Sequence, residues 1–444
     1  NKISIFEEIN YTIIYGLFFN YLFLSVWNIF FPINKTCLIV ALVFIAFSII
    51  KCLDKIIDLI NRYKKSSFNL LFFSLFFVFA LWVACLSNTD IIPYDFGRGH
   101  LQSIKWAMSY PIIKGIGNLF FGLGISCNSW LSIALHNNII DSNLFYWNHS
   151  GFFLVLAFSF FILVPIENVL KQKNISFSKI QIYRLLFFVP LIQWSFNFHP
   201  GTSSDLPVFI FSAILSIELF KYIILDDKSK LYNILIVICL GITSKLSFVF
   251  MAFIVLLLLI PNIIKKLINY QIRLTILVSF LTIILFIGRN TIMTGYPLFP
   301  YHGISLPVKW KMNHEHVISI NTTIKDWANG ITEPGLDEKV KKKLRKERIK
   351  SRLLIQHRRM ETSYPLVLGI LGLIFMILFR KEALNKYFLF ILPAVIQIFI
   401  WFFLFPDNRF SGSAFWWFGA GLGSCLIYNI KLFHSKIILT LTVI

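Results

Sequence analysis

A polar stretch at residues 87–102, SNTDIIPYDFGRGHLQ, follows directly on an apolar run and gathers side chains that could do chemistry. It holds two carboxylates, Asp90 and Asp95, the guanidinium of Arg98 and the imidazole of His100. Ionisable groups at the mouth of an apolar segment are candidates for function because their burial is costly. A carboxylate there can act as general base towards a hydroxyl group. We expect Asp95 to be this base, with Asp90 as the alternative, and we expect Arg98 and His100 to bind substrate. Helix capping or pairing with Arg98 is the structural explanation.

Four further polar positions stand at the ends of apolar runs. They are Asp205 in SSDLP, Lys245 in GITSK, Arg289 in GRN and Arg409 in PDNRFSG. A lysine or arginine in such a place can bind a phosphate group. Snorkelling to the interface explains Lys245 equally well, and pairing with Asp407 explains Arg409 equally well. We expect Asp205 to contribute to substrate binding, although an N-cap of the following helix, with a proline in its first turn, is its simpler role.

Metal ligands come close together in the sequence at His314-Glu315-His316, where no third ligand follows at a suitable spacing. A divalent metal is therefore possible but not supported, and we expect no cofactor. The six cysteines form no C-x-x-C pair, and most of them lie in apolar runs. They are typical of small core residues.

The composition indicates that these polar groups belong to a membrane protein. Of the 444 residues, 57% are hydrophobic and 14% are charged, whereas soluble domains have about 25% charged residues. The sequence therefore predicts an all-α, polytopic membrane helical bundle. Its net charge of +21 is explained by basic loops that set topology and meet anionic membrane lipids. We expect no nucleic-acid partner, because no binding module is recognisable.

A membrane span needs about 20 apolar residues, and on this basis about twelve spans and a partial one are expected. They fall near residues 11–33, 36–53, 68–87, 151–170, 180–198, 206–225, 231–243, 246–263, 272–288, 364–379, 384–405, 413–430 and after His434. Alternating these spans brings the basic loops near residues 51–65, 171–179, 221–230, 265–273, 380–386 and 431–436 to one face. By the positive-inside rule this face is cytoplasmic. The polar motifs then all lie on the extracytoplasmic face.

The chain accordingly divides into four parts. Residues 1–67 form two extra N-terminal transmembrane helices, residues 68–288 a transmembrane core, residues 289–363 an external loop, and residues 364–444 the C-terminal transmembrane helices. The core contains an external loop at residues 88–150, in which two short helices near 100–110 and 129–138 are expected to lie on the membrane surface. The basic segment 336–361 should form a helix. It either rests in solvent or on anionic headgroups, or forms a lid that attracts phosphate.

These motifs together resemble the GT-C superfamily, the integral-membrane glycosyltransferases that use polyprenyl-phosphate-linked sugars. The first external loop of that superfamily begins with an acidic motif and contains two membrane-parallel helices. Asp95 matches the acidic position, and Thr243-Ser244-Lys245 resembles a Thr-Lys pair that contacts the lipid phosphate in some relatives. YDFGRGHLQSIKW, SSDLP, RNTIMTGYPLFP and PDNRFSG resemble a bacterial branch without an assigned substrate. The acidic loop here follows the third span rather than the first, and no acidic doublet is present.

The resemblance implies an inverting transferase in the bacterial inner (cytoplasmic) membrane with an extracytoplasmic active site. A polyprenyl-phosphate-linked sugar would be the donor, and an unknown glycan, lipid or protein the acceptor. Asp95 would deprotonate the acceptor, while Lys245, Arg289 and Arg409 stabilise the leaving phosphate. The alternatives are an O-antigen polymerase or ligase, which also needs external arginines, and a flippase or transporter of lipid-linked sugars. A transporter should place charges within its spans and show repeated halves.

Overall fold

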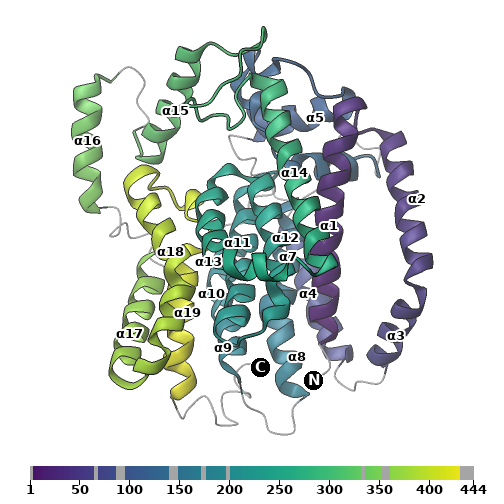
Figure 1. Cartoon of the computed structure of the whole chain (residues 1–444), viewed down its shortest axis with the longest axis vertical. Coiled ribbons are helices and arrows are strands. Elements are labelled where there is room, and N and C mark those ends of the chain that lie inside the picture. The colour runs from purple at the N-terminus through teal and green to yellow at the C-terminus, as the bar shows by residue number, and fades with distance from the viewer. Residues whose placement is uncertain are drawn as a thin grey trace. The chain divides into compact units, whose positions relative to one another are not determined.

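A computed structural model describes residues 4–64, 69–86, 96–139, 149–171, 177–196, 201–331, 336–351 and 361–430. These residues form helices and connecting segments, with no β-strand among them, as Figure 1 shows. Six described helices are long and apolar enough to cross a membrane. They are Ile5–Phe30, His149–Leu170, Asp205–Ile223, Leu246–Lys266, Tyr270–Thr294 and Lys381–Leu404. The predicted all-α polytopic membrane protein is confirmed.

Several other predicted spans correspond to shorter helices. Those are α2 (Lys35–Lys51), α4 (Asn69–Leu86), α12 (Leu231–Ser244), α17 (Ser363–Phe379) and α19 (Ala414–Asn429). The span expected at 180–198 is divided at Phe187 into α9 (Lys179–Leu186) and α10 (Phe188–Phe196). The expected fragment after His434 lies outside the described residues. Apolar runs counted in the sequence therefore exceed full-length spans, because a run can be shortened or broken before it reaches the bilayer thickness.

The chain divides into two compact units. The first comprises Asn1–Glu167, Asn197–Leu206 and Val278–Val317, and the second comprises Asn168–Phe196, Pro207–Leu277 and Ile318–Ile444. Each unit is described by itself below.

The first unit is built on α1 (Ile5–Phe30), which carries polar anchors at both ends. At its N-terminus the buried Glu167 carboxylate accepts hydrogen bonds from the backbone N–H groups of Ile5 (3.0 Å) and Phe6 (3.1 Å). One turn later Glu8 pairs with Arg62 of the basic helix α3 (Leu53–Lys64) at 2.6 Å. The Glu167 carboxylate therefore accepts hydrogen bonds from N–H groups in the first turn of α1, which have no partner within the helix.

The other end of α1 contacts the segment that the sequence predicts as the first external loop, residues 88–150. In this loop η1 (Phe96–His100) leads into α5 (Leu101–Ser109), and α6 (Asn128–His136) follows. The Ile112 N–H donates to the Asn28 carbonyl near the end of α1 at 2.8 Å. Since Asn28 lies 20 residues after Glu8 in a continuous helix, the two ends are separated by about 30 Å, the thickness of a bilayer core.

Both short helices occur where the sequence predicts them, but their burial differs. In α5 only Ile104 and Ala107 are buried, which fits a helix with one covered face. In α6 every residue from Asn128 to Leu135 is buried. The reason is that α1, α2 and α5 pack around it, so α6 is a core element of its unit and not a helix with one face on the membrane surface.

The second unit contains α12, α13 (Val249–Lys266), α17, α18 (Leu384–Leu404) and α19, with α9, α10 and most of α11 (Asp205–Ile223). Helices α17 and α19 approach closely at Gly419, where a Cβ atom would lie 2.2 Å from the Pro365 carbonyl oxygen. Small residues commonly allow such contact between membrane helices. At one end of this unit Lys386 pairs with Asp226. Helix α18 runs from this end towards the loop that carries Arg409.

Candidate functional site

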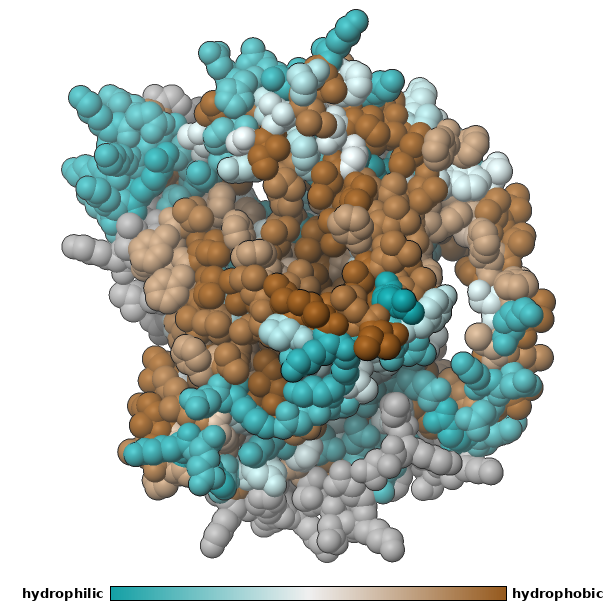
Figure 2. Space-filling view, in the orientation of Figure 1, coloured by the Kyte–Doolittle hydropathy of each residue, from teal (hydrophilic) through white to brown (hydrophobic). Residues whose placement is uncertain are grey.

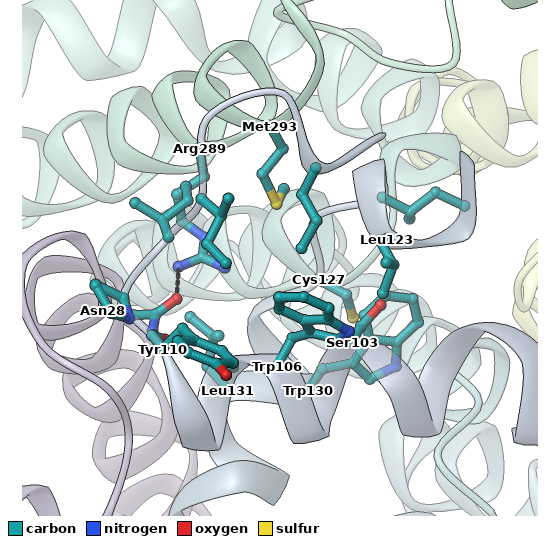
Figure 3. A pocket seen from close by; sticks show the side chains of 16 residues that line it. Asn28, Ser103, Trp106, Tyr110, Leu123, Cys127, Trp130, Leu131, Arg289 and Met293 are labelled. Atoms are coloured by element: carbon teal, nitrogen blue, oxygen red, sulfur yellow. Dashed lines mark hydrogen bonds between the residues drawn. The ribbon is translucent and has the colours of Figure 1, made fainter. Parts of the chain in front are cut away.

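A pocket opens in the first unit where α1, α5, α6 and α14 (Tyr270–Thr294) meet (Figure 3). The pocket is open on one side, and the space between its side chains, including the open mouth, is about 470 Å³. Asn28 comes from the last turns of α1, Trp106 from α5, Trp130 from α6, and Arg289 and Met293 from the end of α14. All of these residues belong to the first unit.

Arg289 is the cation in this pocket. Its side chain is buried, with the residue only 5% exposed. The guanidinium donates to Asn28 Oδ1 at 2.7 Å, the bond drawn in Figure 3, and to Ser126 Oγ at 3.4 Å. Both partners are neutral, and no carboxylate among the described residues forms an ion pair with it. A buried charge without a counter-ion is costly, so the pocket is suited to an anionic group.

The supporting contacts hold Arg289 and Asn28 in this geometry. The Asn28 amide nitrogen donates to the carbonyl oxygens of Phe31 (3.4 Å) and Tyr110 (3.3 Å), which leaves Oδ1 for the guanidinium. The next residue on α14, Asn290, accepts from the Ser126 N–H at 3.3 Å. The site is therefore fixed from two sides by backbone groups, as preorganised sites require.

Aromatic rings line the walls beside this cation. The rings of Trp106 and Tyr110 lie 5.2 Å apart between centroids. The Trp130 indole is held by a hydrogen bond from Nε1 to the Thr202 carbonyl at 2.9 Å, and His100 lies 4.9 Å from its ring. A mainly apolar pocket with few oriented polar groups is the usual form of a ligand site. Rings with apolar faces and polar edges suit a ligand that is partly apolar and partly polar, such as a sugar.

Part of the predicted acidic motif lies outside the described residues. Asp90 and Asp95 lie outside them, and so does the side chain of Arg98, whose backbone belongs to η1. His100 is placed against Trp130, at the wall of the pocket. Asp205 begins α11, and its carboxylate accepts a hydrogen bond from Ser203 Oγ at 2.9 Å. This geometry fits the structural explanation for Asp205.

Lys245 and Arg409 come together in the second unit. Lys245 stands at the break between α12 and η6 (Leu246–Phe248), as predicted, and its Nζ lies 4.6 Å from the centroid of the Phe410 ring. The guanidinium of the adjacent Arg409 lies 3.9 Å above the Trp327 ring, and its Nε donates to Asp407 Oδ1 at 3.3 Å. The predicted pairing with Asp407 is therefore present, alongside a cation–π contact.

Part of the basic helix predicted at 336–361 is observed as α16 (Glu338–Ser351), and residues 352–360 lie outside the described residues. A buried carboxylate holds α16 near Arg409. Asp326, only 5% exposed, directly precedes Trp327, whose ring lies under the Arg409 guanidinium. It accepts from Arg345 and pairs with Lys341 at 3.1 Å. Hydrogen bonding to Asp326 raises the pKa of Lys341 above its usual value. This contact keeps α16 close to Arg409. Both predicted roles of the helix, a lid and a surface helix, are compatible with this position.

Sequence reasoning missed Asn28 and Trp130, which line the pocket, and Ser126, which accepts a hydrogen bond from Arg289. Asn28 offered one clue, as a polar residue in the last turns of an otherwise apolar run. The other two became relevant only through packing. Among the described residues no three His, Cys, Asp or Glu side chains converge as metal ligands would. His314 instead lies 3.3 Å from the Tyr296 hydroxyl.

Residues 2–416 match the model of a family described as "Domain of unknown function (DUF8201)". The match covers most of the chain, so the protein belongs to this family. No curated protein and no solved structure matches the chain.

Proposed function

We propose that this DUF8201 protein is a membrane glycosyltransferase. It would move a sugar from a polyprenyl-phosphate donor to an acceptor hydroxyl on the extracytoplasmic face of a bacterial inner membrane. The observation that carries the proposal is the buried Arg289, which has only neutral partners and lies in a pocket walled by Trp106 and Trp130. A lipid-linked sugar phosphate combines the anionic and ring-shaped parts that such a pocket can bind.

The depth of the pocket supports a lipid-borne donor. Arg289 and Asn28 lie near the ends of α14 and α1, about 30 Å from the Glu8–Arg62 pair at the other end of α1. The phosphate of a membrane lipid lies at this boundary while its chain remains in the hydrocarbon region. Arg62 belongs to a basic loop that the positive-inside rule assigns to the cytoplasm. An extracytoplasmic pocket follows from that assignment.

The reaction in this proposal is a direct displacement. Asp95, or Asp90 in its place, accepts the proton of the acceptor hydroxyl while that oxygen attacks the anomeric carbon. The bond between the anomeric carbon and the phosphate oxygen breaks, and polyprenyl phosphate departs with the electron pair. Arg289 stabilises the negative charge that develops on this oxygen. Lys245 and Arg409 form a second candidate phosphate position, within the second unit.

A transporter is the second candidate because charged residues are buried inside one span. Glu218 in α11 is fully buried, pairs with Lys221 at 3.0 Å and accepts from Asn233 of α12 at 2.7 Å. Ionisable residues within spans often mark transport pathways. An O-antigen polymerase or ligase remains a related enzyme alternative, since it also needs external arginines such as Arg289.

The deciding experiment uses the full chain reconstituted in proteoliposomes with a radiolabelled polyprenyl-phosphate sugar and a mixed glycan acceptor. Wild-type protein should release polyprenyl phosphate and label the acceptor, and Asp95→Asn should abolish labelling. Arg289→Lys should weaken donor use, whereas Arg273→Lys, at the exposed other end of α14, should not. Movement of intact donor across the bilayer without sugar release would instead establish the transporter. Full activity of Asp95→Asn would remove the base assignment.

A further inference from the structure

Helix α3 (Leu53–Lys64) is amphipathic, yet none of its residues is buried by the described part of the chain. It follows α2 after a bend of 69°. No residue of α3 is buried, and Leu53, Ile57 and Ile60 are each about half exposed. Their spacing places them on one side of the helix, with Ile56. Asp54, Lys55, Asp58 and Arg62 occupy the opposite side.

The polar side of α3 contacts α1. Arg62 pairs with Glu8 of α1 at 2.6 Å and with Asp58 of its own helix at 2.9 Å. This pair fixes one edge of α3 against the N-terminal end of α1. The Tyr63 ring, which lies next to Ile56 around the helix, is 6.3 Å from the Phe73 ring of α4, whereas Leu53, Ile57 and Ile60 stay about half exposed.

The preceding helix indicates what covers the stripe. Helix α2 has 17 residues, so it extends about 25 Å and nearly crosses a bilayer core by itself. Its residues from Leu42 to Ile50 are exposed and almost all apolar, and they form a brown column in Figure 2 with the polar residues of α3 beyond its lower end. A helix with the charges of α3 cannot continue into hydrocarbon, and the bend turns it away from the axis of α2.

The net positive charge of α3 and the end of α2 favours an anionic membrane surface as the partner. Lys51, Lys55, Arg62 and Lys64 outnumber Asp54 and Asp58, and both Lys55 and Lys64 are exposed. The cytoplasmic leaflet carries anionic headgroups that attract such segments. Lys64 lies in line with the apolar stripe, one turn after Ile60, and Lys55 lies on the polar side. An amphipathic helix with lysines around an apolar stripe is typical of binding in the plane of the membrane.

We propose that α3 is an interfacial helix that lies in the anionic headgroup layer next to the end of α2. Its Leu53, Ile57 and Ile60 side chains enter the acyl boundary, and Lys64, in line with them, contacts lipid phosphates. Lys55, on the polar side, adds electrostatic attraction to the anionic surface. The proposal does not depend on the glycosyltransferase activity.

Residue depth gives the first test, in nanodiscs, where an aqueous quencher reaches both faces. Ile57→Cys and Asp58→Cys are each labelled with an environment-sensitive fluorophore in a background without the exposed Cys52 and Cys85. Position 57 should be quenched by quencher-bearing lipids and shielded from iodide, and position 58 should show the reverse. Equal behaviour at both positions would overturn the proposal. Shielding of position 57 from both quenchers would overturn it as well, because a protein would then cover the stripe.

Lipid charge gives the second test. Lipid quenching at position 57 should increase when phosphatidylglycerol replaces part of the phosphatidylcholine. In Lys55→Gln/Lys64→Gln this dependence should fall several-fold, by up to about fivefold per lysine, the equivalent of about 1 kcal/mol for each cation near an anionic surface. The matched control Lys309→Gln/Lys311→Gln removes two exposed lysines elsewhere in the first unit and should leave it unchanged. Equal dependence in both variants would refute the contact with lipid phosphates.

Discussion

Replacing Arg289 by methionine should separate stability from ligand binding. In the free protein the guanidinium is buried with two neutral hydrogen-bond partners, Asn28 and Ser126. Its removal loses two charge-assisted hydrogen bonds of about 1.5–3 kcal/mol each. It also relieves the desolvation of an unpaired cation, which is several kcal/mol in proteins. The two effects nearly cancel, so we expect the free energy of unfolding to change by no more than about 1 kcal/mol.

Donor binding should respond very differently to the same change. Loss of one partner from a buried, hydrogen-bonded charge pair costs about 2–5 kcal/mol, which corresponds to a roughly 30- to 4,000-fold weaker donor affinity. In the wild-type protein saturating donor should raise the thermal midpoint by linkage. In Arg289→Met this increase should vanish while the midpoint without donor stays close to wild type.

The assay is thermal unfolding in nanodiscs with and without polyprenyl-phosphate sugar. A second variant, Asn28→Leu/Arg289→Met, removes the acceptor that the single change leaves unpaired, and it should be at least as stable as the single variant. If Arg289→Met alone lowers stability by about 3–5 kcal/mol, Arg289 is one half of a structural ion pair. The argument for an anion site would then be refuted.

Four other substitutions have defined outcomes. Glu167→Ala should destabilise the protein by about 2–4 kcal/mol, because two N–H groups of α1 lose a charged acceptor; an unchanged thermal midpoint would contradict this. Gly419→Ala should destabilise by about 1–3 kcal/mol through overpacking, whereas Gly288→Ala, with open space around its Cβ position, should be tolerated. Equal midpoints for these two variants would show that α17 and α19 do not pack so closely. Lys245→Ala should raise the KM for the lipid-linked donor about 10-fold if this lysine binds phosphate, and an unchanged KM would remove that role.

The sequence was sufficient for the fold class and for the break at Lys245. Long apolar runs indicate helices directly, and a lysine between two short apolar runs indicates a break whatever the tertiary packing. It was insufficient for the length of each span. The run at 180–198, counted as one span, is divided at Phe187. Pro190, in the first turn of α10, cannot donate a backbone hydrogen bond to the preceding turn, and it is the sequence signal for this break.

The site was less predictable than the fold. Arg289 stood out because a cation at that end of α14 goes against the charge bias of the loops. Its partner Asn28 lies 261 residues away in sequence, and such a contact arises only from tertiary packing. The helical spacing of Leu53, Ile57 and Ile60 in α3 was readable in principle, yet the basic residues around them favour a simple loop.

The central claim is that the Arg289 pocket binds the phosphate of a lipid-linked sugar. The most direct measurement is an experimental structure of the full chain in nanodiscs with polyprenyl-phosphate sugar. We predict density for the phosphate within hydrogen-bond distance of the Arg289 guanidinium and density for the sugar ring beside Trp106 and Trp130. A phosphate bound elsewhere, with the pocket filled by protein or water alone, would contradict the account.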